Sequence, residues 1–435
     1  MYWRYFLWNF VGRQSDIQPT DAIITDGNWL SGIRWIDEKY VGPQDNLPRE
    51  IAENKGRNTY YFLPFLLGLI GLVYQLNRDQ RNFSIVLWLF VMMGIALVVY
   101  FNTSPNEPRE RDYVYAGSFY AFCIWIGLGV LAVCDLIVWA TRRKGLMAPI
   151  AATVVCMVVP GILAAQNWDD HDRSHRTMAR DIGWNYLQST LPNSIILNYG
   201  DNDTFPLWLN QEVDGLRPDV RIINLSYLSS DWYANQLYMQ AYESAPVPLT
   251  ATQADVAYDN LSILLVDPDN KTPMELREAL KAAYSGNKRA EYGYPVIPTS
   301  VVYIPVDKAA MVRQGYVAAN DTARLVDRIE IDLTASPSYR GRGALLQSDI
   351  LMLDIIATNA ATGWTRPIYW CATVGNDYYM GLDPYQASTG LALQLVPWRN
   401  SGPSVRSDKF YQNAKRFLWG GADTVSYTHL RAHET

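Results

Sequence analysis

Residues 83–101 read FSIVLWLFVMMGIALVVYF, an apolar run without a single charge. A helix of this length rises far enough, at about 1.5 Å per residue, to cross roughly 30 Å of hydrocarbon. Comparable runs occupy 60–76, 113–140 and 146–165. A helix satisfies its own backbone hydrogen bonds, so it is the form in which such runs cross lipid. The sequence therefore predicts four transmembrane helices within 60–166. Buried core helices of a large soluble protein are the disfavoured alternative, because charges are confined to short loops.

The loops between these runs predict an orientation. Two very short loops carry five cations, namely Arg78 and Arg81 in 77–82, and Arg142, Arg143 and Lys144 in 141–145. Positive loops favour the cytoplasmic side. The loop 102–112 and everything after residue 166 are then expected on the exoplasmic side.

The remainder of the chain alternates between strand-like and helix-like segments. SIILNY at 194–199 and VRIINLS at 220–226 flank a helical stretch at 205–213, which predicts two parallel strands of a βαβ unit. Further strands are expected at 300–304, 328–333 and 367–373, and helices at 170–191, 231–243, 272–284 and 348–358. We therefore expect an α-helical transmembrane bundle followed by an exoplasmic α/β domain with a small mixed or parallel sheet.

These patterns predict four regions. An interfacial or exoplasmic segment covers 1–59, the membrane helices 60–166, and the α/β domain 167–425. The last ten residues, 426–435, continue no earlier pattern and are interpreted as a non-native tail.

Composition excludes several classes of protein. The 37 Lys and Arg against 43 Asp and Glu give a net charge of −6, and no basic block is present. This argues against a nucleic-acid-binding protein, whose phosphate contacts need a basic face. The four cysteines lie in apolar runs or alone, so no disulfide framework is expected, and no Cys/His spacing resembles a zinc site. No cofactor is predicted, although a divalent metal is left open.

The expected exoplasmic loop NTSPNEPRERDY (102–113) is the first candidate site. Arg109 and Arg111 lie at the depth of a lipid head group, with acidic residues around them. Guanidinium groups fork onto phosphate oxygens, so this pair could hold a lipid phosphate and stabilise its charge. The alternative is a solvated turn whose charges pair with one another.

The segment GDNDTFP (200–206) is the second candidate, because ligands often bind where a parallel strand ends. Asp201 and Asp203 form a D-x-D pair that could bind a metal–phosphate group, with Thr204 beside them. The favoured alternative is a turn and helix cap, with Asp203 or Thr204 as the N-cap residue.

The segment WDDHDRSH (168–175) is the third candidate. His171 and His175 share a helical face, which could hold a divalent metal. The favoured alternative is a helix N-terminus capped by Asp169 and Asp170. A metal hydrolase built from His171, His175, Asp201 and Asp203 is kept as a hypothesis, and it requires those four side chains to converge.

Several long motifs together resemble a known family. These are MYWRYFLWNFVGRQSDIQ, GPQDNLP, PRERDYVYAGSFYAF, DDHDRSHR, GDNDTFPLW, DVRIINLSYL, YIPVDK and LDIIATN with RPIYW. Over nearly all of residues 1 to about 423 the chain resembles a large bacterial multi-pass family of unassigned function. That family is similar to the transmembrane protein O-mannosyltransferases of the GT-C class.

The resemblance implies transfer of a sugar from a polyprenyl-phosphate donor to Ser or Thr hydroxyls of exported proteins. It also implies a bacterial inner-membrane protein whose C-terminal domain is periplasmic. Such enzymes place an acidic general base in an early exoplasmic loop, which is expected upstream of Met1, so no catalytic residue is assigned here. We expect an internal fragment of the enzyme. The competing hypothesis is a non-catalytic, membrane-anchored module that binds a protein or a glycan.

Overall fold

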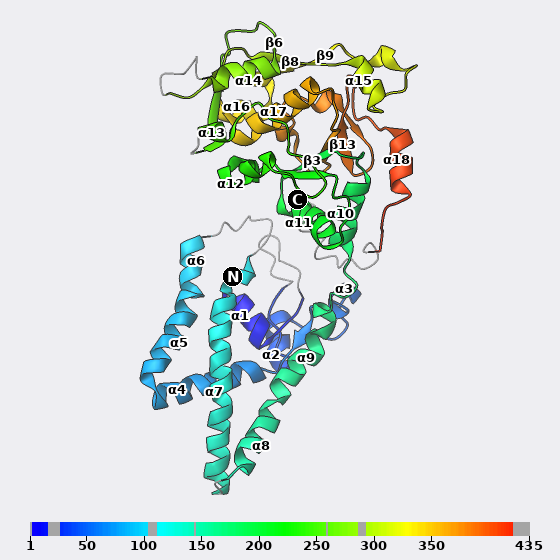
Figure 1. The fold of residues 1–435 in the computed structure, drawn as a ribbon. Helices are drawn as coiled ribbons and strands as arrows, with labels where there is room; N and C mark the ends of the chain where they lie inside the picture. Colours follow the sequence, from blue (N-terminus) through cyan, green and yellow to red (C-terminus); the bar gives the residue numbers. More distant parts are fainter. Residues whose placement is uncertain are drawn as a thin grey trace. The chain divides into compact units, whose positions relative to one another are not determined.

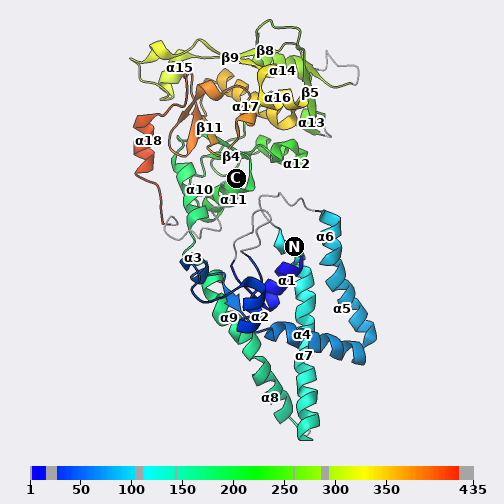
Figure 2. The same cartoon turned by 180° about the vertical axis from the view of Figure 1, so that it is seen from behind.

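The computed structural model describes residues 2–15, 27–102, 111–142, 145–257, 260–285 and 293–420. The chain divides into two units, which we call unit 1 (within 1–175) and unit 2 (within 176–423). Figures 1 and 2 show the helical unit 1 and the mixed α/β unit 2 from opposite sides. Each unit is described by itself.

Three segments in the described part of unit 1 are long and apolar enough to cross a membrane. The first is Gln80–Phe101, made of α5 (Gln80–Met92) and α6 (Ile95–Phe101). The second is Tyr113–Thr141, mostly α7 (Ala116–Thr141), and the third is Met147–His171, made of α8 (Met147–Cys156) and α9 (Val158–His171). Most side chains of these segments are not buried inside the protein. The spans indicate an integral membrane protein.

The prediction of a fourth span at 60–76 is wrong. The backbone at Tyr61 and Phe62 has φ of 55° and 58°, so α4 begins only at Leu63 and ends at Arg78. Its 16 residues rise about 24 Å, which is short of the hydrocarbon thickness. Both views also show α4 lying across α7 rather than alongside it (Figures 1 and 2).

Glycines bring α4 and α7 into close contact. A Cβ added to Gly71 would overlap the backbone of Trp125, and one added to Gly129 would overlap the backbone of Leu67. The Trp125 indole donates to Gln75 Oε1 across the same crossing, at 2.8 Å. Small residues that let backbones approach are typical of helix packing in membranes. The crossing is therefore fixed by shape as well as by a buried hydrogen bond.

The N-terminal segment packs against the same helices. Helix α1 (Tyr2–Phe10) contributes Phe6 and Phe10 to an aromatic cluster with Phe122 and Trp125. The short strands β1 (Gly12–Arg13) and β2 (Asn58–Thr59) pair with each other, and α2 (Arg34–Val41) and α3 (Arg49–Ala52) lie between them in the chain. Arg13 forms an ion pair with Asp170 at 2.9 Å, which attaches this segment to the end of α9.

Unit 2 is built around a five-stranded mixed sheet of order β12-β13-β11-β3-β4. The strands are β3 (Ile195–Asn198), β4 (Arg221–Asn224), β11 (Ile368–Cys371), β12 (Gln386–Ser388) and β13 (Ala392–Leu395). Strand β3 runs parallel to both β4 and β11, and β13 is antiparallel to β11 and β12. The predicted parallel pair and the small mixed sheet are confirmed.

Two three-stranded sheets complete unit 2. They are β6 (Met274–Glu275), β8 (Val301–Pro305) and β9 (Arg328–Asp332), and β10 (Leu345–Leu346), β5 (Ile263–Val266) and β7 (Val296–Ile297). Helix α17 (Gln347–Ala361) is buried along almost its whole length. The other α-helices are α10 (Met178–Gln188), α11 (Asp201–Trp208), α12 (Asp231–Ala234), α13 (Gln253–Val256), α14 (Leu276–Tyr284), α15 (Lys308–Arg313), α16 (Pro337–Arg342) and α18 (Ser407–Ala414).

Four predicted helices have clearly different bounds. The stretch expected at 205–213 begins earlier, as α11 at Asp201, and its second half, Leu209–Val213, is a π-helical turn. The helix expected at 170–191 is two helices, because α9 continues to His171 and α10 starts at Met178. The helix expected at 272–284 starts at Leu276, since Met274 and Glu275 pair with β8 as β6. The helix expected at 231–243 is one α-helical turn, α12, followed by a 3₁₀ turn at Asn235–Tyr238.

Candidate functional site

The GDNDT segment lies at the carboxyl end of β3. Gly200 adopts an extended conformation and is the N-cap residue of α11, which starts at Asp201. No side chain caps this helix. The prediction that Asp203 or Thr204 is the N-cap is therefore wrong, and the reason is that both side chains bond elsewhere in unit 2.

Asp203 belongs to a buried polar cluster between neighbouring strands. Its side chain is only 5% exposed and accepts a hydrogen bond from the Thr373 hydroxyl, which follows β11. The Tyr186 hydroxyl of α10 is a second partner. Burial raises the pKa of the Asp203 carboxyl, because it disfavours the charged form more than these hydrogen bonds favour it. This carboxyl joins α10, α11 and β11 and is not open to solvent.

Thr204 connects the ends of β3 and β4. Its hydroxyl donates to Asn198 Oδ1 at 2.5 Å and accepts from Asn224 Nδ2 at 2.7 Å. All three side chains are buried. A hydroxyl that both donates to and accepts from these two asparagines holds the two strand ends together. Thr204 is thus placed to fix the geometry of the loop rather than to contact a ligand.

Asp201 is the exposed carboxylate of the D-x-D pair. Its Oδ1 accepts a hydrogen bond from the Tyr227 hydroxyl at 2.9 Å, and this bond raises the pKa of Tyr227. Asp201 and Asp203 therefore lie in different surroundings, one at the surface and one in the interior. Across the part of the chain that the structure describes, no group of three or more His, Cys, Asp or Glu side chains could hold a metal ion.

A row of aromatic rings accompanies Asp201. Phe205, Trp208, Tyr227 and Trp232 follow one another with ring centroids 5.9, 6.2 and 6.4 Å apart. Phe205 is 53% exposed and Trp232 62% exposed. Aromatic rings can pack against the apolar face of a ligand, and neighbouring polar side chains can form hydrogen bonds with its polar groups. We did not predict this row, and its only signal in the sequence was the spacing of Phe205 and Trp208 on one helix.

The predicted phosphate-binding pair is only partly within the described residues. Arg109 lies outside them. Arg111 is exposed and directly precedes the 3₁₀ turn Asp112–Tyr115 that leads into α7. The structure thus places Arg111 at the start of the second span.

The histidine segment ends a helix instead of beginning one. His171 is the last residue of α9, and its Nδ1 lies 2.9 Å from the carbonyl oxygen of Asn167. Asp172 accepts hydrogen bonds from the backbone and hydroxyl of Ser174, which lower the pKa of Asp172. Asp169 and Asp170 lie in the last turn of α9, so they do not cap a helix N-terminus.

Comparison with protein families gives one result. A model described as TMEM260-associated domain 2 matches residues 179–413, which is more than half of the chain. The chain belongs to this family. The matched range starts at the second residue of α10 and ends within α18, so the family domain coincides with most of unit 2. Among curated proteins and solved structures, no match to the chain was found.

Proposed function

We propose that this chain is part of a GT-C-type membrane glycosyltransferase. The enzyme transfers a sugar from a polyprenyl-phosphate lipid to Ser or Thr hydroxyls of exported proteins, at the periplasmic face of a bacterial inner membrane. The order of the spans carries the proposal. Two candidate spans, Tyr113–Thr141 and Met147–His171, separate the loop with Arg109 and Arg111 from unit 2. Two crossings return the chain to the same side, so the loop and unit 2 share one compartment.

The chemistry assigns a part to each region. The acceptor hydroxyl oxygen attacks the anomeric carbon as the bond from that carbon to the phosphate oxygen breaks, and a carboxylate base takes the hydroxyl proton. No residue of this chain is assigned as that base. Arg109 and Arg111 stabilise the negative charge on the departing lipid phosphate. Arg111 directly precedes the turn that leads into α7, and the end of a membrane span is the depth at which a lipid phosphate lies.

Unit 2 contributes a surface for the acceptor or its sugar. Asp201 is exposed at the end of β3, oriented by Tyr227, and the aromatic row extends from it. Carboxylate oxygens accept hydrogen bonds from hydroxyl groups, and ring faces contact apolar surface. The buried Asp203 and Thr204 hold this edge in place. The same surface also favours the second candidate function, a membrane-anchored module that binds a glycan or protein without transferring a sugar.

The leaving-group role can be tested in cells that express the complete gene. We expect Arg109→Ala combined with Arg111→Ala to lower glycan transfer to an exported protein by about 100-fold or more, the scale seen when a group that stabilises transition-state charge is removed. Arg142→Ala, which removes a cation from the loop on the other side, is the matched control and should transfer normally. Undiminished transfer by the double variant would refute the assignment, and transfer by no variant, wild type included, would favour the binding module.

A further inference from the structure

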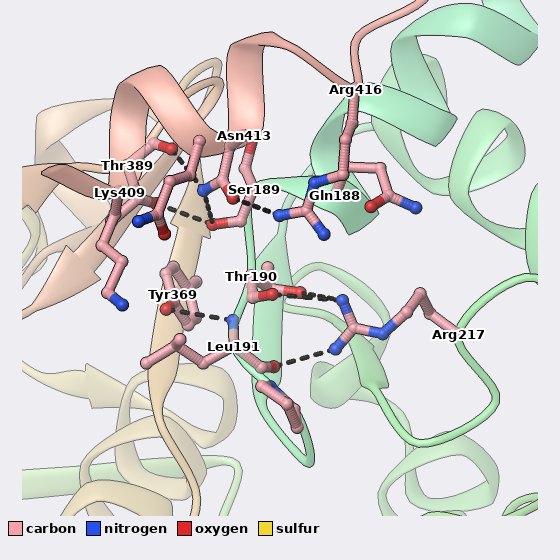
Figure 3. Close-up of a pocket in the computed structure, with 12 residues that line it drawn as sticks. Gln188, Ser189, Thr190, Leu191, Arg217, Tyr369, Thr389, Lys409, Asn413 and Arg416 are labelled. Atoms are coloured by element: carbon pink, nitrogen blue, oxygen red, sulfur yellow. Dashed lines mark hydrogen bonds between the residues drawn. The ribbon is translucent and has the colours of Figure 1, made fainter. Parts of the chain in front are cut away.

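A cavity of about 260 Å³ opens beside the C-terminal end of α10 (Figure 3). Arg217, Lys409 and Arg416 line it together with hydroxyl and amide side chains, and its described lining contains no Asp or Glu. The whole chain carries a net charge of −6, whereas all the charged side chains that line this cavity are cations. An excess of one charge in a partly enclosed site favours a ligand of the opposite charge.

The Arg217 guanidinium already has hydrogen-bond and ion-pair partners within the protein. Its Nε and Nη2 donate to the Asp219 carboxylate at 2.8 and 2.9 Å. Its guanidinium also donates to the carbonyl oxygens of Leu187, Thr190 and Leu191, in the last turn of α10 and just after it. Arg217 therefore completes a helix end, and the positive charge available to a ligand lies on the other side of the cavity.

Lys409 and Arg416 supply that charge from α18 and the turn after it. Within the residues that the structure describes, Lys409 Nζ has no hydrogen-bond or ion-pair partner. Arg416 donates through Nη2 to Asn413 Oδ1 at 2.6 Å, an uncharged acceptor. Asn413 in turn donates to the Thr389 carbonyl oxygen at 2.7 Å, which fixes this side of α18 (Figure 3). Two cations that have no carboxylate partner among the described residues therefore line the cavity, and Asn413 orders one of them.

A second cavity on unit 2 shows the contrast. It has a volume of about 500 Å³ and is also lined by Lys409, together with Arg324 and Arg406. There Arg324 pairs with Asp321 at 2.9 Å, and Arg406 with Asp408 at 3.7 Å. Both arginines of that cavity are therefore paired with carboxylates from its own wall. In the smaller cavity Arg217 is paired in the same way, with Asp219, whereas Arg416 has no carboxylate partner among the described residues.

We propose that the smaller cavity binds the phosphate group of an anionic ligand, with Arg416 and Lys409 as its ligands. Arginine presents a planar fork that matches phosphate oxygens, and lysine adds a compact point charge. A volume of 260 Å³ accommodates a phosphate together with part of the molecule that carries it. The phosphate belongs to a soluble sugar phosphate or to a lipid. The cavity and the GDNDT loop flank opposite ends of β3, so this site does not depend on the proposed function.

The test is phosphate binding by the full chain in detergent, followed by titration calorimetry. We expect wild type to bind inorganic phosphate, with affinity falling as salt is raised. Lys409→Gln and Arg416→Gln should each lower the affinity about tenfold or more, the equivalent of one charge-assisted hydrogen bond. Lys415→Gln is the matched control, because Lys415 is exposed on the same segment and does not line the cavity. The affinity of the Lys415→Gln protein for phosphate should stay at the wild-type value.

Two competitors identify the source of the phosphate. Glucose 6-phosphate displaces inorganic phosphate more strongly if the natural ligand is a sugar phosphate, and a short isoprenyl phosphate does so if it is a lipid. Either result supports the site. Absence of phosphate binding by wild type overturns it, and so does a loss in Lys415→Gln as large as that in Lys409→Gln, since that indicates diffuse attraction. A melting curve of each variant separates loss of the site from loss of fold.

Discussion

Two apolar helical segments of this molecule bury their side chains to opposite extents. Helix α17 in unit 2 is buried around almost its whole circumference, and Leu353 is 0% exposed. The span made of α8 and α9 in unit 1 leaves most of its apolar side chains uncovered, and Val154 is 65% exposed. Apolar side chains on every side of a helix need an apolar medium around them, and the buried polar side chains of α17 also need partners within the protein. Protein is that medium for α17, and lipid is the medium that suits the span.

Truncating a side chain in each helix is the strongest test of this difference. Leu353→Ala leaves a cavity in a packed core, so we expect unit 2 to lose about 2–5 kcal/mol of stability. The matched change Val154→Ala removes a side chain that faces outward and should change stability by less than about 0.5 kcal/mol. Pulse proteolysis of the detergent-solubilised chain, with cleavage in unit 1 and in unit 2 followed separately, measures both effects. Equal losses in the two variants would show that the span is packed against protein.

The crossing of α4 and α7 sharpens the comparison, because it is the part of the helical unit where protein meets protein closely. Gly71→Ala places a methyl group against the Trp125 backbone and should cost about 1–3 kcal/mol through overpacking. Gly127→Ala on α7 is the control, since no atom lies within 4 Å of an added Cβ there. The temperature at which the solubilised chain aggregates reports the effect. An unchanged aggregation temperature of the Gly71→Ala protein would mean that the crossing is loosely packed.

The smallest expected effect concerns a buried polar group. The raised pKa of Asp203 means that its carboxyl binds a proton more tightly in the folded than in the unfolded chain. The resulting stability is complete below the unfolded pKa of about 4 and is lost as pH rises through the folded pKa. Wild type should therefore lose stability relative to Asp203→Asn as pH rises above about 4. Denaturation midpoints of both proteins against pH measure this, and parallel curves would contradict it.

Much of the fold followed from local patterns, and the failures have identifiable causes. Length and hydropathy were sufficient to predict the three spans. The helical stretch between two apolar strands was sufficient to predict the parallel pair of β3 and β4. The segment 60–76 met the same criterion but failed as a span. Backbone dihedrals at Tyr61 and Phe62, which shorten α4, depend on tertiary contacts that composition does not encode.

The candidate site was less predictable than the fold. The sequence predicted that the GDNDT segment lies at the carboxyl end of a parallel strand, and the structure has it directly after β3. The separation of Asp201 from Asp203 was not visible, because Thr373 and Tyr186 reach Asp203 from segments distant in sequence. The aromatic row was missed for the same reason, since Tyr227 and Trp232 join Phe205 and Trp208 only in three dimensions. Arg109 and Arg111 remain predictions.

The exposed indoles of the spans have a practical consequence. Trp88, Trp139 and Trp168 lie on the first, second and third span, and each is more than half exposed. In a bilayer their fluorescence becomes sensitive to brominated acyl chains, whereas Trp364 and Trp370 in the core of unit 2 stay shielded from quenching. The native chain thus carries optical reporters of lipid contact, and no dye or label has to be attached to read them.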